Sequence, residues 1–510
     1  MDSVLSLFSN LALGFTTALS PANLWFCFLG VFVGTLIGVL PGIGPIAAIA
    51  MLLPMTFKLP PVGSLIMLAG IYYGTMYGGS TTSILLKLPG ETASVVTCID
   101  GYEMAKQGRA GPALAIAALG SFFAGTVCTV LIALAGPALA KMAFEFGAPE
   151  YFSLMVMSLI ASVVLTHGSV LKAIGMICLG LICGSVGTDV NSGVARLTFG
   201  VIGLTNGLSI IVIAMGLFSF SEIIANLGKG GERESRDLLS KKIHGLMPTW
   251  TDIKASSGAI VRGTAIGAFF GILPGTGPAI SAFSSYMLEK QIAKDPSRFG
   301  KGAIEGVAGP EASNNADAQC KFIPMLSLGI PASGVMALML GALMIQGITP
   351  GPQVMTQNPT LFWGLIVSMW IGNAMLLILN LPLIGLWVKL LQVPYRFLVP
   401  AIMMFMAIGV YTVNNDAQDV YLTILFGLLG YVFMQLKMSP VPMILAFVLG
   451  PPLEEHLRRA FLLSRGDPTV FVTRPISAAF LIVAVLLLVF MIMPAMRKKR
   501  EVVLEGEEEA

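Results

Sequence analysis

The chain has 510 residues, of which 55% are hydrophobic and 11% charged, and its mean hydropathy is +0.85. This composition excludes a water-soluble globule with a polar surface and predicts a polytopic membrane protein. The net charge of +3 is too small to indicate binding to nucleic acid.

Long charge-free runs divide the sequence and set its fold class. A membrane-spanning helix needs roughly 20 residues, so the two longest runs must fold back inside the bilayer. The runs do not alternate in polarity as β-barrel strands do, so we predict an all-α fold with about 10 to 14 membrane segments. The runs are Ser3–Phe57, Leu59–Leu86, Ala110–Ala140, Leu197–Ser221, Gly263–Leu288, Phe322–Val388 and Pro475–Met496.

The first run contains "GTLIGVLPGIGP" at Gly34–Pro45, and "GAFFGILPGTGP" repeats its pattern at Gly267–Pro278. Proline removes a backbone donor and glycine exposes the peptide, so each motif predicts a broken helix with unpaired N–H and C=O groups. In lipid such groups survive where they line a cavity or bind a ligand. Half-helix N-termini suit a carboxylate and half-helix C-termini suit a sodium ion. The candidate binding residues here are Pro41, Gly42, Gly44, Pro45, Pro274, Gly275, Gly277 and Pro278.

A packing role is the alternative interpretation of these motifs. Gly34 with Gly38, and Gly267 with Gly271, have the small-xxx-small spacing that lets two helices approach closely. Packing alone explains neither the paired prolines nor the duplication, so we favour a binding role for the Pro-Gly part of each motif.

A second pair of segments joins a polar stretch to an apolar turn that ends in proline. These are "YYGTMYGGSTTSILLKLPGETAS" at 72–94 and "EASNNADAQCKFIPMLSLGIPASG" at 311–334, and both resemble discontinuous or re-entrant helices. Their hydroxyls and amides can bind anionic oxygen or sodium, although Ser and Thr also bond to carbonyls of their own helix. Lys87 and Glu91 flank Pro89 and are candidates for gate or substrate charges, with a place at the membrane interface as the alternative. The candidate binding residues are Ser80, Thr81, Thr82, Asn314 and Asn315.

The distribution of basic residues predicts the orientation of the chain. "MRKKR" at 496–500 places the C-terminus in the cytoplasm, and the basic segment Lys229–Arg262 is also predicted to be cytoplasmic. The lack of any basic residue before Lys58 favours an outside N-terminus. The helix before Pro41 then starts outside and the one before Pro274 starts inside, which predicts two inverted repeats. The predicted organisation is an N-terminal half at 1–228, a cytoplasmic connecting loop at 229–262, a C-terminal half at 263–470, and a final transmembrane helix with a cytoplasmic tail at 471–510.

With these motifs the chain resembles the large membrane subunit of the tripartite tricarboxylate transporters, whose mark is a duplicated G-x-x-x-G-x-x-P-G-x-G-P. Further matching stretches are "YGGSTTSILLKLPGE", "DGYEMAKQGRAGPAL", "PEASNNA" and "LGIPASG". The resemblance implies a multi-pass bacterial inner-membrane permease that works with a small membrane subunit and a periplasmic solute-binding protein, and takes up a carboxylate using an ion gradient. It also adds Gly79 to the binding residues. Lys87 stands where the family pattern has asparagine, and Asp317 where it has a small residue.

Other classes of function fit the residues less well. A channel would show rings of like charge or repeated filter loops, and an intramembrane hydrolase would need a nucleophile and base at membrane depth. His167 lies in an apolar segment without a matching serine motif. A stand-alone carboxylate exchanger is the alternative among carriers. We expect no enzyme activity and no cofactor, and we expect sodium as the coupling ion, with protons as the alternative through Glu91, Glu311 or Asp317.

Overall fold

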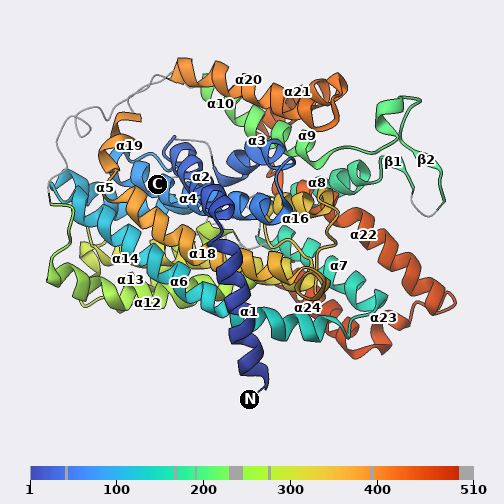
Figure 1. The fold of residues 1–510 in the computed structure, drawn as a ribbon, viewed down its shortest axis with the longest axis horizontal. Coiled ribbons are helices and arrows are strands. Elements are labelled where there is room, and N and C mark those ends of the chain that lie inside the picture. The colour runs from blue at the N-terminus through green and yellow to red at the C-terminus, as the bar shows by residue number, and fades with distance from the viewer. Residues whose placement is uncertain are drawn as a thin grey trace.

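The computed structural model describes residues 2–40, 44–165, 169–189, 192–228, 245–273, 277–390 and 395–492. Helices make up nearly all of it (Figure 1), which confirms the predicted all-α fold. Within these described residues, five helices are long and apolar enough to cross a membrane. They are α2 (Pro21–Gly38), α6 (Ala110–Ala143), α12 (Trp250–Ile272), α18 (Pro359–Asn380) and α21 (Ala417–Gln435).

The remaining elements lie before, between and after these five helices. Before α12 they are α1 (Asp2–Ala18), α3 (Pro45–Thr56), α4 (Pro61–Leu86), η1 (Thr92–Ser94), α5 (Val95–Lys106), α7 (Ala148–Leu165), α8 (Val170–Gly184), β1 (Gly187–Thr188), β2 (Ala195–Arg196), η2 (Ile202–Leu204), α9 (Ile210–Ala214), η3 (Met215–Phe220) and α10 (Ser221–Gly228). After α12 they are α13 (Pro278–Ile292), η4 (Pro296–Arg298), α14 (Glu305–Cys320), α15 (Phe322–Leu328), α16 (Gly334–Ile345), α17 (Gln353–Gln357), α19 (Ile384–Leu390), α20 (Tyr395–Asn414), α22 (Val441–Leu463), α23 (Val470–Thr473) and α24 (Pro475–Ile492).

Both Pro-Gly motifs end one helix and begin another. In the first, α2 ends at Gly38 and α3 begins at Pro45, with Gly44 as its N-cap. In the second, α12 ends at Ile272 and α13 begins at Pro278, with Gly277 as its N-cap. Proline suits the first helical position because its missing N–H has no intrahelical partner there. The structure therefore agrees with the predicted helix breaks at their described ends.

The glycines before each break let two helix pairs pack at backbone contact. A Cβ added at Gly34 would lie 2.5 Å from the carbonyl oxygen of Ile71 on α4, and one at Gly271 would lie 2.6 Å from the carbonyl oxygen of Asp317 on α14. Side chains cannot occupy such gaps, so α2 lies directly on α4 and α12 directly on α14. For Gly34, Gly38, Gly267 and Gly271, the packing interpretation of the GxxxG spacing is therefore correct.

The helices α4 and α14 hold matching places in the two halves, and both are enclosed by other helices. Every residue of α4 from Gly63 and every residue of α14 from Gly306 is buried. Each helix, with α15 extending α14, ends at a residue in the left-handed conformation, Lys87 with φ 57° and Gly329 with φ 72°. Pro89 and Pro331 then follow at the same distance from these ends. The second pair of predicted discontinuous segments is thus a pair of equivalent helix ends.

The predicted connecting loop is partly helical. Residues 229–244 lie outside the described part of the chain, but α12 begins at Trp250, so residues 250–262 are helix and not loop. The helix begins behind a capping box in which Thr249 and Asp252 exchange side-chain and backbone hydrogen bonds. This cap satisfies the first free N–H groups of the helix and explains its early start.

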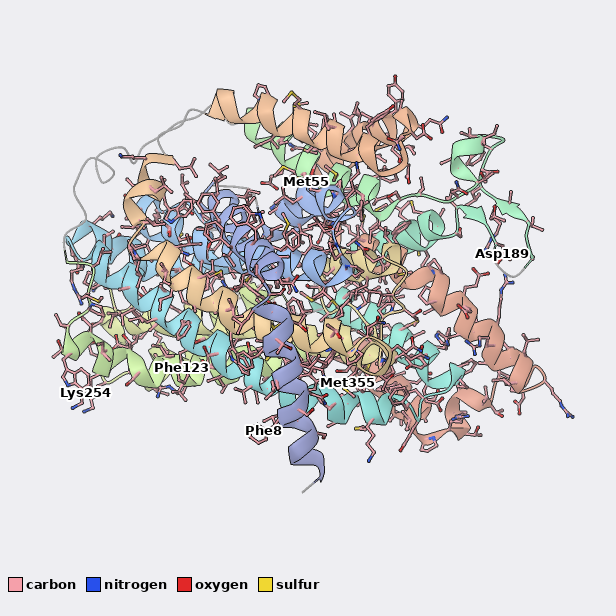
Figure 2. All side chains as sticks on the ribbon, in the orientation of Figure 1. Phe8, Met55, Phe123, Asp189, Lys254 and Met355 are labelled. Carbon is pink, nitrogen blue, oxygen red and sulfur yellow. The ribbon has the colours of Figure 1, made fainter. Side chains whose placement is uncertain are left out.

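The outer helices surround the buried helices α4 and α14 and expose apolar side chains. In Figure 1, α20 and α21 lie along the upper edge and α22 to α24 at the lower right, while α18 contacts α1, α4 and α6. Phe8 on α1 and Phe123 on α6 lie on the outside (Figure 2) and are 66% and 41% exposed. Large exposed apolar side chains on helices of this length are what a lipid-facing surface requires.

Candidate functional site

A buried cluster of polar side chains lies where α14 meets α4, α5 and α6. Helix α14 is rich in polar and small residues, "EGVAGPEASNNADAQC", yet it is enclosed along almost its whole length. Buried polar groups require partners, because an unpaired one costs several kcal/mol in an apolar medium. We call the cluster the polar centre; its members are Ser80, Glu91, Thr97, Ser121, Glu311, Asn314, Asn315, Asp317 and Lys321.

Glu311 accepts hydrogen bonds from two helices of the first half. The Ser80 hydroxyl on α4 donates to its Oε2 at 2.7 Å, and the Thr97 hydroxyl on α5 donates to its Oε1 at 2.5 Å. Glu311 belongs to the second half of the chain and both donors belong to the first. The carboxylate therefore joins the two halves.

Glu91 makes the reciprocal connection. It lies at the N-cap of η1 and forms a capping box with Ser94, while its Oε1 accepts a 2.7 Å hydrogen bond from the amide Nδ2 of Asn314. The neighbouring Asn315 donates through Nδ2 to the Ser121 hydroxyl on α6 at 2.7 Å. Side chains of each half therefore form hydrogen bonds with an acid or an amide of the other half.

Lys321 and Asp317 form an ion pair within α14 and its extension, and both side chains are completely buried. Their i,i+4 spacing places them on one helix face. Asp317 is also the residue against which the last turn of α12 packs, through Gly271. The second broken helix therefore ends beside the polar centre.

The first broken helix ends there as well. The turn that carries Glu91 passes so close to α2 and α4 that a Cβ at Gly90 would lie 2.8 Å from the carbonyl oxygen of Gly38 and in contact with the Cα of Gly79. Because Gly38 is the last residue of α2, the break begins next to Glu91. Glycine at position 90 is what permits this approach.

The structure brings several predicted site residues together and separates others. Gly79, Ser80, Glu91, Asn314 and Asn315 meet in the polar centre. The Thr82 hydroxyl donates to the carbonyl oxygen of Gly79 in its own helix at 2.9 Å, so it follows the alternative given for Ser and Thr hydroxyls. Thr81 is buried in α4. Lys87 is exposed at the end of α4. Pro41, Gly42, Pro274 and Gly275 lie outside the described residues.

The two N-cap glycines differ from the packing glycines. An added Cβ would meet nothing within 4 Å at Gly44 or at Gly277, and their φ angles are −72° and −86°. Among the described residues, none therefore fills the space beside the starts of α3 and α13, at Pro45 and Pro278. This is the arrangement that a ligand at a half-helix N-terminus would need.

Some members of the polar centre were not identified from the sequence. Lys321 carries a signal, because it follows Asp317 at the spacing of a helical ion pair. Thr97 and Ser121 carry none, and neither does Gly90 beside the polar centre, since their roles depend on which helices meet in the folded chain.

Another buried carboxylate, that of Asp100 on α5, also joins the halves. Its Oδ1 accepts hydrogen bonds from the backbone N–H groups of Gly300, Gly302 and Ala303 at 2.9, 2.8 and 2.8 Å. Its Oδ2 accepts a 2.9 Å hydrogen bond from the hydroxyl of Tyr286. Gly300 and Gly302 have φ angles of 82° and 97°, which turn successive N–H groups toward the carboxylate.

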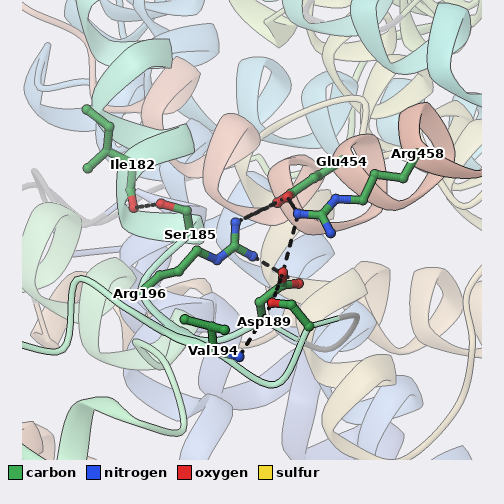
Figure 3. Close-up of polar contacts among 8 residues, drawn as sticks. Ile182, Ser185, Asp189, Val194, Arg196, Glu454 and Arg458 are labelled. Carbon is green, nitrogen blue, oxygen red and sulfur yellow. Dashed lines mark hydrogen bonds and ion pairs between the residues drawn. The ribbon is translucent and has the colours of Figure 1, made fainter. Parts of the chain in front are cut away.

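A separate ion network ties the β1–β2 segment to α22. Figure 3 shows Arg196 Nη1 donating to both carboxylate oxygens of Glu454, each at 3.1 Å. Asp189 lies 3.3 Å from both Arg196 and Arg458, and Arg458 donates to Glu454 at 2.5 Å. The arginines are 33% and 41% exposed, so the network is partly screened by water.

This network borders a cavity of about 760 Å³. Besides Arg196 and Glu454, its lining includes Tyr151 on α7 and His456 on α22, whose rings stack 4.9 Å apart. The lining also includes Gly329, the left-handed end of α15. The cavity therefore reaches from a polar rim to one of the two equivalent helix ends.

We expect Lys87→Asn to raise the thermal stability of the protein. Lys87 has φ 57°, a conformation that asparagine adopts more readily than lysine, so the change should stabilise the helix end by roughly 0.5 to 1 kcal/mol. The melting temperature in detergent measures this. Lys141→Asn, the same change inside α6, is the control and should not stabilise. Uptake that falls while stability rises would assign the Lys87 charge a transport role; a lower melting temperature would contradict the backbone argument.

These features define a class: a multi-pass helical membrane protein with duplicated broken helices that end at a buried polar centre, an architecture that recurs in secondary transporters. The chain belongs to the tripartite tricarboxylate transporter TctA family, whose model matches residues 24–445, and is thus a large subunit of such a transporter.

Two proteins of Agrobacterium vitis are similar to this chain. "Uncharacterized 52.8 kDa protein in TAR-I ttuC' 3'region" is 56% identical over 505 residues, which cover 99% of this chain and 100% of that protein. "Uncharacterized protein in TAR-II ttuC' 3'region" is 57% identical over 235 residues, 46% of this chain and 97% of that protein. No solved structure matches.

Proposed function

We propose that this chain carries a tricarboxylate or related carboxylate across the bacterial inner membrane into the cell, driven by an ion gradient. It acts as the permease of a complex with a small membrane subunit and a periplasmic solute-binding protein, and its C-terminus lies in the cytoplasm. Membership of the TctA family supports the transport class and the presence of partner subunits. The observation that carries the proposal is the pair of broken helices that both end at the polar centre.

The half-helices α3 and α13 are the proposed contacts for the carboxylate. Each begins with a proline behind a glycine cap that borders open space, so free backbone N–H groups and the positive end of the helix dipole are available to an anion. Inverted halves would place the two starts on opposite sides of one substrate. Sodium is the proposed coupling ion.

The cavity beside α22 supports an aqueous route toward this region. Its volume of about 760 Å³ exceeds that of a single tricarboxylate, and it extends to Gly329. The ion network of Arg196, Asp189, Glu454 and Arg458 lies at the rim of this cavity. If the rim opened, the ion pairs would break and the two arginines would bind water or substrate in place of the protein carboxylates.

Reconstitution in liposomes tests the proposal. We expect the large subunit alone to take up little free citrate or C4-dicarboxylate, and the large subunit with the small subunit and a loaded binding protein to accumulate it under an inward sodium gradient. Uptake is measured with radiolabelled substrate, and liposomes without a gradient serve as the control. Robust uptake of free substrate by the single chain would instead support a stand-alone exchanger, and no uptake by the full complex with any carboxylate would reject the proposal.

A further inference from the structure

The polar centre contains more negative than positive side chains. Glu91, Glu311 and Asp317 are acidic, whereas Lys321 is basic and already pairs with Asp317. An isolated charged carboxylate in a dry interior is costly, and it persists there only when a positive charge or a proton neutralises it. Three acids against one base therefore leave the polar centre short of positive charge.

Glu311, like Glu91, has no paired positive charge among the described residues. It is 1% exposed, and it forms no ion pair within the described part of the chain. Its two hydrogen bonds come from the neutral hydroxyls of Ser80 and Thr97. These hydroxyls reduce the cost of the charge but do not neutralise it.

Two buried oxygens close to Glu311 along α14 and α4 have no hydrogen-bond partner among the described residues. The first is Oδ1 of Asn314, which lies one helical turn from Glu311 on the same face of α14. The second is the hydroxyl of Tyr77, which lies one turn before Ser80 on α4 and within electrostatic reach of Glu311. Unpaired acceptor oxygens beside an unneutralised carboxylate are the features that an oxygen-binding cation would satisfy.

We propose that Glu311 binds the monovalent cation whose gradient drives transport, together with the Ser80 and Thr97 hydroxyls and the Asn314 side-chain oxygen. This inference rests on the proposed function and names the site of its coupling ion. Sodium suits the oxygen set, since hydroxyl, amide and carboxylate oxygens are ligands of hard cations. Ser80 can turn a lone pair toward the ion, because its hydroxyl also lies 3.1 Å from the carbonyl oxygen of Met76, which then accepts its proton.

The position of Glu311 explains how such an ion would couple to transport. Ser80 and Thr97 belong to the first half of the chain, and Glu311 to the second, so the ion bridges the halves. With the ion bound, the charge of Glu311 is neutralised and the halves can move past each other; without it, the uncompensated Glu311 carboxylate opposes that movement through apolar surroundings.

A Glu311→Gln variant tests the site by two measurements. In detergent, NaCl should raise the melting temperature of the wild type relative to equal choline chloride, because a ligand that binds the folded state stabilises it, and the variant should lose this shift. In liposomes holding the full complex, sodium-driven accumulation should fall by roughly tenfold or more, while exchange of internal for external substrate should continue, because glutamine mimics the neutral site.

Glu150→Gln is the matched control. Glu150 is equally buried, 2% exposed, but pairs with Arg474 far from the polar centre, so this variant should keep the sodium-dependent shift. If Glu311→Gln does not fold, Thr97→Val removes one ion ligand with little change in shape and should weaken the apparent sodium affinity. An unchanged sodium shift and unchanged sodium-driven uptake in Glu311→Gln or Thr97→Val would overturn the site.

Uptake assays with a proton gradient show whether the positive charge at Glu311 is sodium or a proton. The titratable groups that face Glu311 are Tyr77 on α4, Cys98 on α5 and Glu91 before η1, with Asp317 and Lys321 further along α14. If an inward proton gradient without sodium drives uptake in the wild type and not in Glu311→Gln, Glu311 is the site and the ion is a proton. The sodium-dependent shift in melting temperature can be measured without substrate. If the protein shows this shift but transports no carboxylate, the ion site is supported and the proposed function fails.

Discussion

Gly44→Val and Gly277→Val are each expected to abolish carboxylate uptake while the protein keeps its fold and its melting temperature. No atom of the described residues lies within 4 Å of a Cβ at either position, and both φ angles are negative, so valine meets neither a steric clash with them nor a forbidden backbone conformation. The added isopropyl group would instead occupy the open space in front of the half-helix N-terminus, where the anion is proposed to bind. Uptake by the reconstituted complex and melting in detergent should be measured on the same preparations.

Gly34→Val and Gly267→Val provide the contrast, because they test packing at the same two motifs. An added Cβ at Gly34 lies 2.5 Å from a backbone oxygen of α4, and one at Gly267 contacts the carbonyl oxygen of Ser313 on α14. Overpacking of this kind costs about 1 to 3 kcal/mol or more, so these variants should melt earlier and assemble poorly. If uptake in the Gly44 and Gly277 variants fell only in proportion to stability, the whole motif would be a packing device.

The fold class and the helix breaks could be predicted because they depend on local chemistry. The closely spaced prolines and glycines of each motif disfavour a continuous helix through local chemistry, so the ends of α2 and α12 could be predicted from the motifs. The start of α12 was also encoded locally, in the capping pair Thr249 and Asp252, but the basic composition of that segment obscured it.

The connections within the polar centre could not be predicted, because they depend on which helices meet. Ser80 and Glu311 are 231 residues apart, and nothing in either segment specifies the other. Helix α14 is a further example, since its polar residues favour a surface position. It is buried because its small residues admit α12 at backbone contact and because the first half of the chain supplies partners for Glu311, Asn314 and Asn315.

Asp100→Ala is expected to be among the most destabilising single changes in this protein. The Asp100 carboxylate accepts three backbone N–H groups from residues 300–303 and the hydroxyl of Tyr286, and it is completely buried. Alanine would leave these donors without partners in a closed interior, at a cost of about 3 to 5 kcal/mol. The melting temperature in detergent and the yield of inserted protein should both fall.

A graded series separates the role of the acceptor oxygens from that of side-chain volume. Asp100→Asn keeps the volume and one oxygen for the three N–H groups, so it should destabilise less than Asp100→Ala. Tyr286→Phe removes one donor and leaves the backbone bonds intact, so it should cost about 1 kcal/mol. Because Asp100 lies in the first half and its backbone donors in the second, the loss should appear as separation of the halves, measurable as faster proteolysis in the 296–304 connection. Equal melting temperatures for Asp100→Ala and Tyr286→Phe would show that the three backbone hydrogen bonds do not hold the halves together.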